Sequence, residues 1–176
     1  MYEKKTIVVN LLAGPGAAKS TFCASIFAEL KWLGVNTEVA LEYAKDLVWE
    51  ESEHILKNQF FVFGNQLQRL WRLNGKVDVI VTDSSLLNSI IYDAKNDSNF
   101  RNLILSEYKK FHNVNYFIVR NKPYIQIGRS QNYQEALQLD NKILTMLSVE
   151  NIEYKKIIGA KENIQTIINE IITLLQ

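Results

Sequence analysis

The nine residues A-G-P-G-A-A-K-S-T, Ala13 to Thr21, lie between an apolar run, Ile7 to Leu12, and a helical pattern that starts near Lys19. A strand, a tight turn and a helix in this order are typical of a phosphate-binding loop, whose backbone N–H groups and helix N-terminus face the phosphates. A lysine then contacts the outer phosphates and a hydroxyl holds Mg²⁺. Lys19 and Ser20 occupy these two positions. The sequence therefore predicts ATP, or another nucleoside triphosphate, and Mg²⁺ as cofactors.

Two alanines depart from the usual G-x-x-x-x-G-K-[ST] pattern, because Ala13 and Ala18 stand where that pattern has glycine. The Cβ atom of Ala18 is expected to crowd the position at which backbone and phosphate approach most closely. This departure favours a protein with little turnover. The alternative for the whole stretch is a turn between strand and helix that binds nothing. The predicted nucleotide contacts are Gly14, Pro15, Gly16, Ala17, Ala18, Lys19, Ser20 and Thr21.

Length and charge are those of one ordinary globular domain, which we expect to span residues 1–176. The net charge of +1 argues against nucleic acid as a partner. Cys23 is the only cysteine, so no internal disulfide forms, and we expect it to be a small buried hydrophobe. With no secretory leader pattern and no apolar run of membrane-spanning length, the sequence predicts a cytoplasmic protein without membrane contact. A homo-oligomer is left open.

Strand-like and helix-like patterns alternate along the chain, which predicts an α/β fold of three layers with a parallel sheet of five strands. Strands are expected at 6–12, 37–41, 77–82, 114–119 and 154–158, and helices at 19–33, 50–73, 100–111, 136–147 and 162–175. The aromatic residues Phe60, Phe61 and Phe63 of the long second helix are expected in the core.

Asp83 directly follows the apolar run V-I-V-T, residues 79–82. Ligands of open α/β sheets bind at the carboxyl ends of the strands. In P-loop proteins an acidic residue here orders Mg²⁺, while the hydroxyl of the loop contacts the metal directly. We therefore assign Asp83 and Ser20 to a metal site and give Asp83 a catalytic role. The alternative is that Asp83 caps the next helix, and both roles can hold together.

A second group of charged residues follows the next expected strand, in L-E-Y-A-K-D-L, residues 41–47. A carboxylate at this edge can accept the proton of an attacking hydroxyl. Glu42 is the first candidate for this base, because it lies immediately beyond the strand, and Asp46 is the second. The alternative is a solvated loop whose charges face water.

The polar segment of about 121–135 is expected to act as a lid. Cations on a closing lid neutralise the charge that develops during phosphoryl transfer. Arg129, next to Gly128, is the candidate arginine and is assigned a catalytic role together with Lys19. A surface loop with scattered cations is the alternative.

The motifs A-G-P-G-A-A-K-S-T, L-E-Y-A-K-D, V-I-V-T-D-S-S-L-L and G-R-S-Q follow one another in this order. In this the chain resembles the P-loop kinase-type NTPases of the ATP-binding group that includes the ribosylnicotinamide kinase domain and small phage ATP-binding proteins. The resemblance implies a sheet order of 2-3-1-4-5, phosphate and Mg²⁺ at Lys19 and Ser20, and an acceptor near Glu42. Many nucleoside and nucleotide kinases have an Asp-Arg pair after strand three, but here Ser84 follows Asp83.

Together these features predict a MgATP-dependent phosphotransferase that acts on a small acceptor: a nucleoside, a nucleotide or a pyridine ribonucleoside. The rival hypothesis is a nucleotide-binding regulatory or interaction protein with little or no turnover, which Ala18 favours. A third hypothesis, an ATPase acting on nucleic acid, is weakened by the balanced charge and by the lack of a basic stripe.

Overall fold

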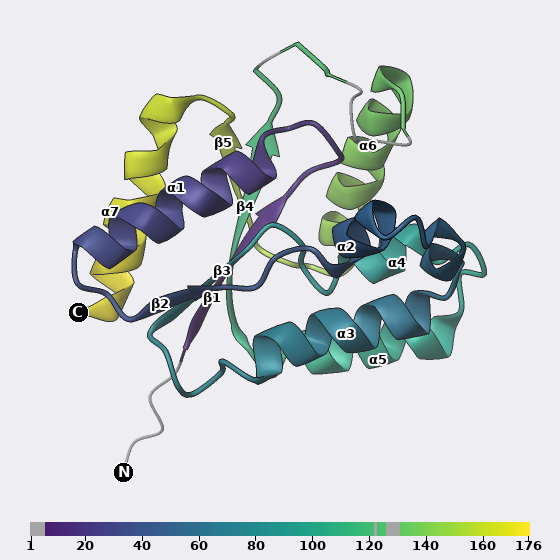
Figure 1. Ribbon diagram of the computed structural model, residues 1–176, viewed down its shortest axis with the longest axis horizontal. Helices are drawn as coiled ribbons and strands as arrows, with labels where there is room; N and C mark the ends of the chain where they lie inside the picture. Colours follow the sequence, from purple (N-terminus) through teal and green to yellow (C-terminus); the bar gives the residue numbers. More distant parts are fainter. Residues whose placement is uncertain (1–5, 122, 126–130) are drawn as a thin grey trace.

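The computed structural model describes residues 6–121, 123–125 and 131–176, along which strands and helices alternate (Figure 1). In chain order the elements are β1 (Ile7–Leu12), α1 (Lys19–Trp32), β2 (Thr37–Val39), α2 (Tyr43–Trp49), the short 3₁₀ helix η1 (Glu53–Lys57), α3 (Gln59–Trp71), β3 (Val79–Thr82), α4 (Asn88–Tyr92), α5 (Ser98–Tyr108), β4 (His112–Val119), α6 (Tyr133–Val149), β5 (Lys155–Ile158), a second 3₁₀ helix η2 (Lys161–Asn163) and α7 (Ile164–Leu175).

The five strands form one parallel sheet in the order β2-β3-β1-β4-β5. This confirms the predicted fold class and the predicted strand order. β1 pairs with β3 on one side and with β4 on the other, so that Ile7 lies beside both Val79 and His112. All six residues of β1 are buried, as expected for a central strand covered on both faces.

The side chains of β1 alternate between two apolar layers because successive residues of a strand point to opposite faces of the sheet. Ile7, Val9 and Leu11 pack in the layer that contains buried residues of α1 and α7. Val8 and Leu12 pack in the layer that contains residues of α3, α4, α5 and α6. Figure 1 shows α1 and α7 together on one side of the sheet and α3 and α5 together on the other. The result is the three-layer arrangement that the sequence predicts.

The helix predicted over residues 50–73 is wrong in its first half. The chain there contains the C-cap of α2 at Glu50, a break at Glu51 with a φ of 53°, and η1, and only then α3. α3 begins after Asn58, whose side-chain oxygen accepts a hydrogen bond from the Phe61 N–H at 3.3 Å. An asparagine N-cap of this kind satisfies a free N–H of the first turn and so stabilises the start of a separate helix at this point.

Two of the three aromatic residues predicted for the core are not there. Phe63 is buried, but Phe60 is 56% exposed and Phe61 is 44% exposed. The reason is helical periodicity: the buried face of α3 runs along Gln59, Val62, Phe63, Gln66 and Leu70, and Phe60 and Phe61 lie away from this face. Burial of Cys23 is confirmed, and that burial raises the pKa of its thiol to about 12, so the thiol stays protonated at neutral pH.

In the described part of the chain, no helix combines the length and the apolar character that crossing a membrane requires.

Candidate functional site

The loop between β1 and α1 has two residues with positive φ. Gly16 has a φ of 80°, and Ala18 has a φ of 70° with a ψ of 19°, which is the left-handed helical region. Ala18 is the N-cap of α1, and its carbonyl accepts the Phe22 N–H at 3.0 Å. An alanine in this region costs about 1–2 kcal/mol, because its Cβ approaches the following carbonyl. The phosphate-loop pattern has glycine at this position, and the backbone conformation gives a physical reason for that preference.

The side chain of Ala18 packs against the apolar layer formed with α1 and α7. Sequence reasoning assigned its Cβ only a steric effect on phosphate. The structure adds a cost that is conformational and is present whether or not a ligand is bound.

Lys19 lies at the first position of α1 and turns back over the loop. Its Nζ donates hydrogen bonds to the carbonyl oxygens of Ala13 at 2.8 Å and Gly14 at 3.1 Å. Burial lowers the pKa of this ammonium, while the negative charges of Glu42, Asp83 and Asp140 act in the opposite direction and Arg120 adds to the lowering. The charges of three carboxylates from three different parts of the chain therefore act on the lysine of the loop.

Glu42 and Asp83 lie side by side at the carboxyl edge of the sheet. The register of β2 and β3 pairs Val39 with Val81, and the Glu42 N–H then donates to Asp83 Oδ1 at 3.0 Å. Asp83 is only 4% exposed. Burial is the main cause that raises the pKa of Glu42, with Asp83 adding to the rise and Lys19 opposing it. The structure thus brings together Lys19, Glu42 and Asp83, three of the residues that the sequence singled out.

Asp83 does not cap the next helix in the way that the alternative interpretation required. α4 begins at Asn88, and no side chain hydrogen-bonds to its first turn as a cap. The carboxylate of Asp83 instead accepts the N–H of Glu42, the residue at the N-cap of α2.

The segment after Glu42 is a helix and not the solvated loop that was considered as an alternative. Asp46 on this helix forms an ion pair with Arg69 of α3, and Arg69 also donates to the Leu41 carbonyl at 2.9 Å. The guanidinium stacks over the ring of Tyr43, 5.2 Å from its centroid. Because its carboxylate is occupied by Arg69, Asp46 is a poor candidate for a base, and Glu42 is the better one.

Ser20 and Thr21 are exposed in the first turn of α1. Cys23, one turn further along the same helix from Ser20, donates a hydrogen bond from its Sγ to the Val81 carbonyl of β3 at 3.7 Å. The start of α1 and the end of β3 are therefore neighbours. Among the described residues no group of three or more His, Cys, Asp or Glu side chains could hold a metal ion by itself. One hydroxyl and one carboxylate, completed by phosphate oxygens and water, form a donor set that Mg²⁺ accepts.

The sequence analysis missed an ion pair that contacts the loop. Arg120 follows β4, and its Nε donates to Asp140 Oδ2 of α6 at 2.6 Å. Arg120 Nη1 donates to the Pro15 carbonyl at 2.6 Å, and the Gly14 N–H donates to Asp140 Oδ1 at 2.6 Å. Two signals could have revealed this pair. Arg120 ends a parallel strand as Asp83 does, and Asp140 lies within the apolar stripe of α6 with Ala136, Ile143 and Leu147.

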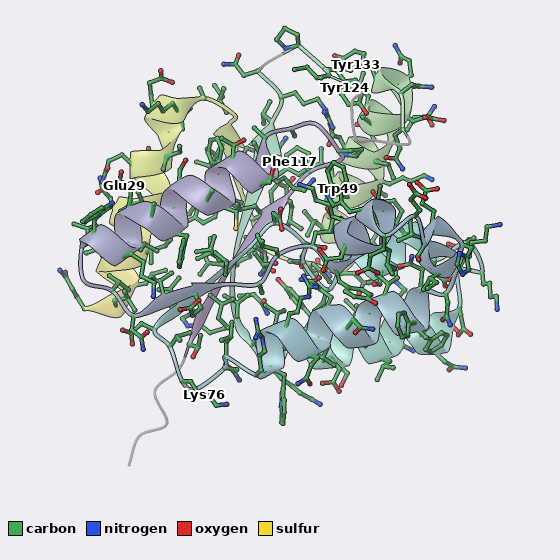
Figure 2. The ribbon with its side chains drawn as sticks, in the orientation of Figure 1. Glu29, Trp49, Lys76, Phe117, Tyr124 and Tyr133 are labelled. Atoms are coloured by element: carbon green, nitrogen blue, oxygen red, sulfur yellow. The ribbon has the colours of Figure 1, made fainter. Side chains whose placement is uncertain are left out.

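The candidate lid arginine, Arg129, lies outside the described residues. The described residues near it contact the loop. A Cβ atom on Gly16 would lie 2.7 Å from the ring of Tyr124, whose hydroxyl donates to the Gln131 carbonyl at 2.5 Å. Tyr124 and Tyr133 lie together in Figure 2, with ring centroids 5.8 Å apart.

α6 begins at Tyr133, three residues before the predicted start, because Asn132 and Glu135 form a capping box.

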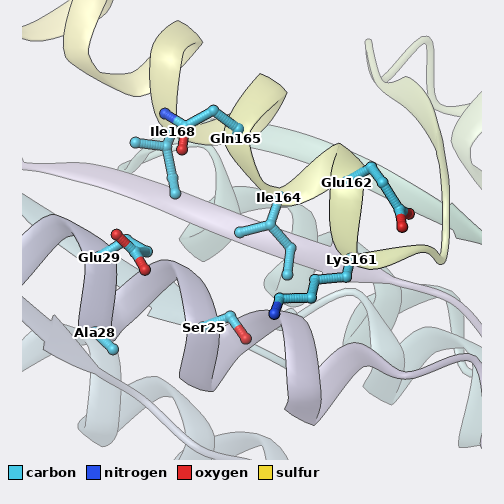
Figure 3. A pocket seen from close by; sticks show the side chains of 8 residues that line it. All are labelled: Ser25, Ala28, Glu29, Lys161, Glu162, Ile164, Gln165 and Ile168. Atoms are coloured by element: carbon cyan, nitrogen blue, oxygen red, sulfur yellow. The ribbon is translucent and has the colours of Figure 1, made fainter.

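A hollow of about 510 Å³ lies elsewhere, between α1 and the start of α7 (Figure 3). Its lining includes Ser25, Glu29, Lys161 and Gln165 and none of the predicted phosphate contacts. The candidate site is therefore defined by converging side chains and a shaped loop rather than by this hollow.

A model of the AAA domain family matches residues 8–165. The chain belongs to this family. The match covers the phosphate loop, Glu42, Asp83, Arg120 and Asp140. The chain is thus a P-loop NTPase with a nucleotide-binding loop. No curated protein matches it significantly.

Two solved structures are similar in fold at low identity. Thymidylate kinase from Ehrlichia chaffeensis superimposes with a TM-score of 0.62 at 12% identity, over 98% of this chain and 100% of the kinase chain. The crystal structure of APE1195 gives a TM-score of 0.49 at 16% identity, with 98% of each chain covered. The first similarity supports a kinase-like fold with the observed strand order.

The backbone of Ala18 generates a stability prediction. Ala18→Gly is expected to raise the free energy of unfolding by about 1 kcal/mol, because glycine adopts a positive φ without strain. Ala24→Gly, at an exposed position in the interior of the same helix, is the matched control and should lower it by about 1 kcal/mol. Urea unfolding followed by circular dichroism measures both changes. Loss of stability in both variants would contradict the left-handed conformation of Ala18.

Proposed function

We propose that this protein is a MgATP-dependent phosphotransferase whose acceptor is a small molecule: a nucleoside, a nucleotide or a pyridine ribonucleoside. The observation that supports this most is the convergence of Lys19, Glu42 and Asp83 at the edge of the sheet where the phosphate loop begins. A loop that only bound phosphate would not need a partly buried carboxylate beside its lysine. Such a carboxylate is useful where a hydroxyl has to lose a proton.

In this proposal Glu42 takes the proton from the acceptor hydroxyl. The oxygen of that hydroxyl bonds to the γ-phosphorus, the bond from the γ-phosphorus to the bridging oxygen breaks, and the nucleoside diphosphate leaves. Burial raises the pKa of Glu42, which brings its basicity closer to the range in which a general base works at neutral pH. Lys19 and the lid residue Arg129 balance negative charge on the transferred group. Ser20 and Asp83 would hold Mg²⁺, which supplies further positive charge at the phosphates.

The charges around Lys19 explain why the proposed donor is a metal complex. The negative charges of Glu42, Asp83 and Asp140 all act on this lysine, as does the positive charge of Arg120. A free triphosphate would meet more carboxylates than cations among these described residues. Neutralisation of phosphate charge by Mg²⁺ makes binding at such a site favourable.

Gln66 supports an acceptor with a polar ring substituent. Its Oε1 accepts the Tyr43 N–H at 2.9 Å, which fixes the amide, and the side chain is 4% exposed beside the start of α2. Its buried Nε2 has no hydrogen-bond partner within the described structure. A buried donor without a partner costs about 1–3 kcal/mol, and a carbonyl oxygen or a ring nitrogen of an acceptor would satisfy it.

The second candidate function is a nucleotide-binding regulatory protein with little or no turnover. The strained alanine at position 18 favours it, since the loop then lacks the glycine that relaxes most easily around a transferring phosphoryl group. Incubation of the purified protein with MgATP and a panel of nucleosides, nucleotides and nicotinamide riboside distinguishes the two. Formation of a phosphorylated acceptor supports the phosphotransferase, and nucleotide binding without any product supports the regulator.

Nucleotide binding at the loop is tested with Lys19→Ala. At about one hundred times its Kd, a ligand that binds only the folded state stabilises it by about 2.7 kcal/mol, which raises the Tm by several degrees. We expect MgATP to raise the Tm of the wild type in this way and to have little effect on Lys19→Ala. Lys31→Ala is the matched control, because Lys31 lies on the same helix and pairs with Glu38 at the surface. Equal shifts in all three proteins would contradict nucleotide binding at Lys19.

The roles of the two carboxylates are separated by kinetics. Loss of a general base costs about 10²–10⁴ in rate, so Glu42→Gln should lower kcat by that factor with little change in the affinity for ATP. Asp83→Asn should instead raise the Mg²⁺ concentration needed for half-maximal activity. Initial rates over a Mg²⁺ series measure both effects. Glu38→Gln, on β2 and paired with Lys31, should match the wild type. Full activity of Glu42→Gln with every active acceptor would make Asp83 the candidate base.

A further inference from the structure

One ion pair holds two consecutive residues of the phosphate loop. Asp140 Oδ1 accepts the Gly14 N–H at 2.6 Å, and Asp140 Oδ2 accepts Arg120 Nε at 2.6 Å. Arg120 Nη1 in turn donates to the Pro15 carbonyl at 2.6 Å. The side chains of Arg120 and Asp140 are only 10% and 13% exposed, so water competes little for these bonds. We call this pair the loop clamp.

The loop clamp fixes the direction of a peptide group. The C=O and N–H of one planar trans peptide point in opposite directions. While Arg120 binds the Pro15 carbonyl, the Gly16 N–H therefore points the other way, and rotation of this peptide is blocked. A peptide that flipped would turn a carbonyl oxygen toward the side where the loop presents its donors, and that oxygen would repel phosphate.

The residues packed around the phosphate loop leave no space for a side chain at Gly14 or Gly16. A Cβ atom on Gly14 would lie 2.6 Å from the Ala136 carbonyl and 3.0 Å from Arg120 Nη2. The same segment of chain places Tyr124 against Gly16, with the guanidinium of Arg120 5.9 Å from the centre of the Tyr124 ring. The loop is thus packed closely against residues from the end of β4 and from α6.

Close packing of this kind is what a strained residue requires. A non-glycine residue in the left-handed region persists only where its surroundings over-determine its conformation. Ala18 is such a residue, and it lies three positions after Pro15. Without the contacts to Arg120 and Asp140, the loop could relieve the strain at Ala18 by leaving the conformation that presents its N–H groups.

We propose that Arg120 and Asp140 are positioning residues, which hold the phosphate loop in its nucleotide-binding conformation against the strain at Ala18. This inference rests on the proposed nucleotide site and deepens it. It assigns an effect on nucleotide affinity to Asp140 of α6, which acts through its contact with the backbone of the phosphate loop. It also explains how the loop tolerates an alanine at position 18, where the phosphate-loop pattern has glycine.

The test is a double-mutant cycle between Asp140→Asn and Ala18→Gly, read by calorimetric titration with MgATP. Asp140→Asn should weaken MgATP binding by about tenfold or more, as is typical for the loss of charged hydrogen bonds. The same change in the Ala18→Gly background should weaken it much less, because glycine holds the loop conformation without help. Equal losses in the two backgrounds, or no loss in either, would overturn the proposal.

Two further variants keep the result interpretable. Glu150→Gln removes a similar ion pair, Arg101 with Glu150 at the C-terminal end of α6, and should leave MgATP binding unchanged in both backgrounds. Arg120→Lys keeps the positive charge but loses the fork that binds carboxylate and carbonyl together. It should reproduce the effect of Asp140→Asn and its suppression by Ala18→Gly, and it replaces Asp140→Asn if that protein does not fold.

Urea unfolding separates failure of this inference from failure of the proposed function. If MgATP binds neither the wild type nor Ala18→Gly, the proposed function fails, but the loop clamp is still tested. Ala18→Gly should raise the urea midpoint more in the wild type than in Asp140→Asn, because only the clamped loop retains the strain that glycine removes. Equal increases in the two backgrounds would show that the clamp does not act on Ala18.

Discussion

The hydrogen-bonded register of β1 between β3 and β4 determines where the phosphate loop, Asp83 and Arg120 lie. Parallel pairing brings the carboxyl ends of neighbouring strands to one edge, so the phosphate loop after Leu12, Asp83 after β3 and Arg120 after β4 are placed near one another. β1 is buried on both faces, and a slip of one residue would exchange its two apolar faces. The same packing that stabilises the sheet therefore fixes the site.

The conformation of the phosphate loop depends on contacts with charged side chains more than on the loop sequence itself. Lys19, Arg120 and Asp140 between them bind backbone atoms of Ala13, Gly14 and Pro15. A loop with glycine at every turn position needs fewer such contacts, since glycine reaches a positive φ without cost. Here a left-handed alanine and a network of charged side chains occur together. The alanine is thus no evidence that the loop has lost its shape, and it does not by itself decide between a kinase and a regulatory protein; catalysis at Glu42 does.

What the sequence predicted, and what it did not, follows from the range of the interactions involved. The phosphate loop and the positions of Glu42 and Asp83 were predictable, because each depends on a local pattern at the end of a strand. The strand order came only from the resemblance to the P-loop kinase-type NTPases, and the structure confirms it. The break before α3 was missed, because it depends on the Asn58 side chain capping the first turn of α3, and one continuous helix was expected over residues 50–73. The pairing of Arg120 with Asp140 is a contact across 20 residues. The local sequence near Arg120 or Asp140 does not predict which partner either residue has. An acidic residue in the apolar stripe of α6 could nevertheless have been recognised as one that needs a partner.

Arg120 and Asp140 connect the phosphate loop to the segment of about 121–135 that was expected to act as a lid. Arg120 follows β4 and Asp140 lies in α6, so the two residues flank that segment. The phosphate loop and the two ends of that segment are therefore joined by a largely buried ion pair. Residues that share partners in this way do not contribute independent free energies. Substitutions in the phosphate loop and in the segment from 121 to 135 should then be analysed as coupled changes, because each alters the contacts through which the other acts.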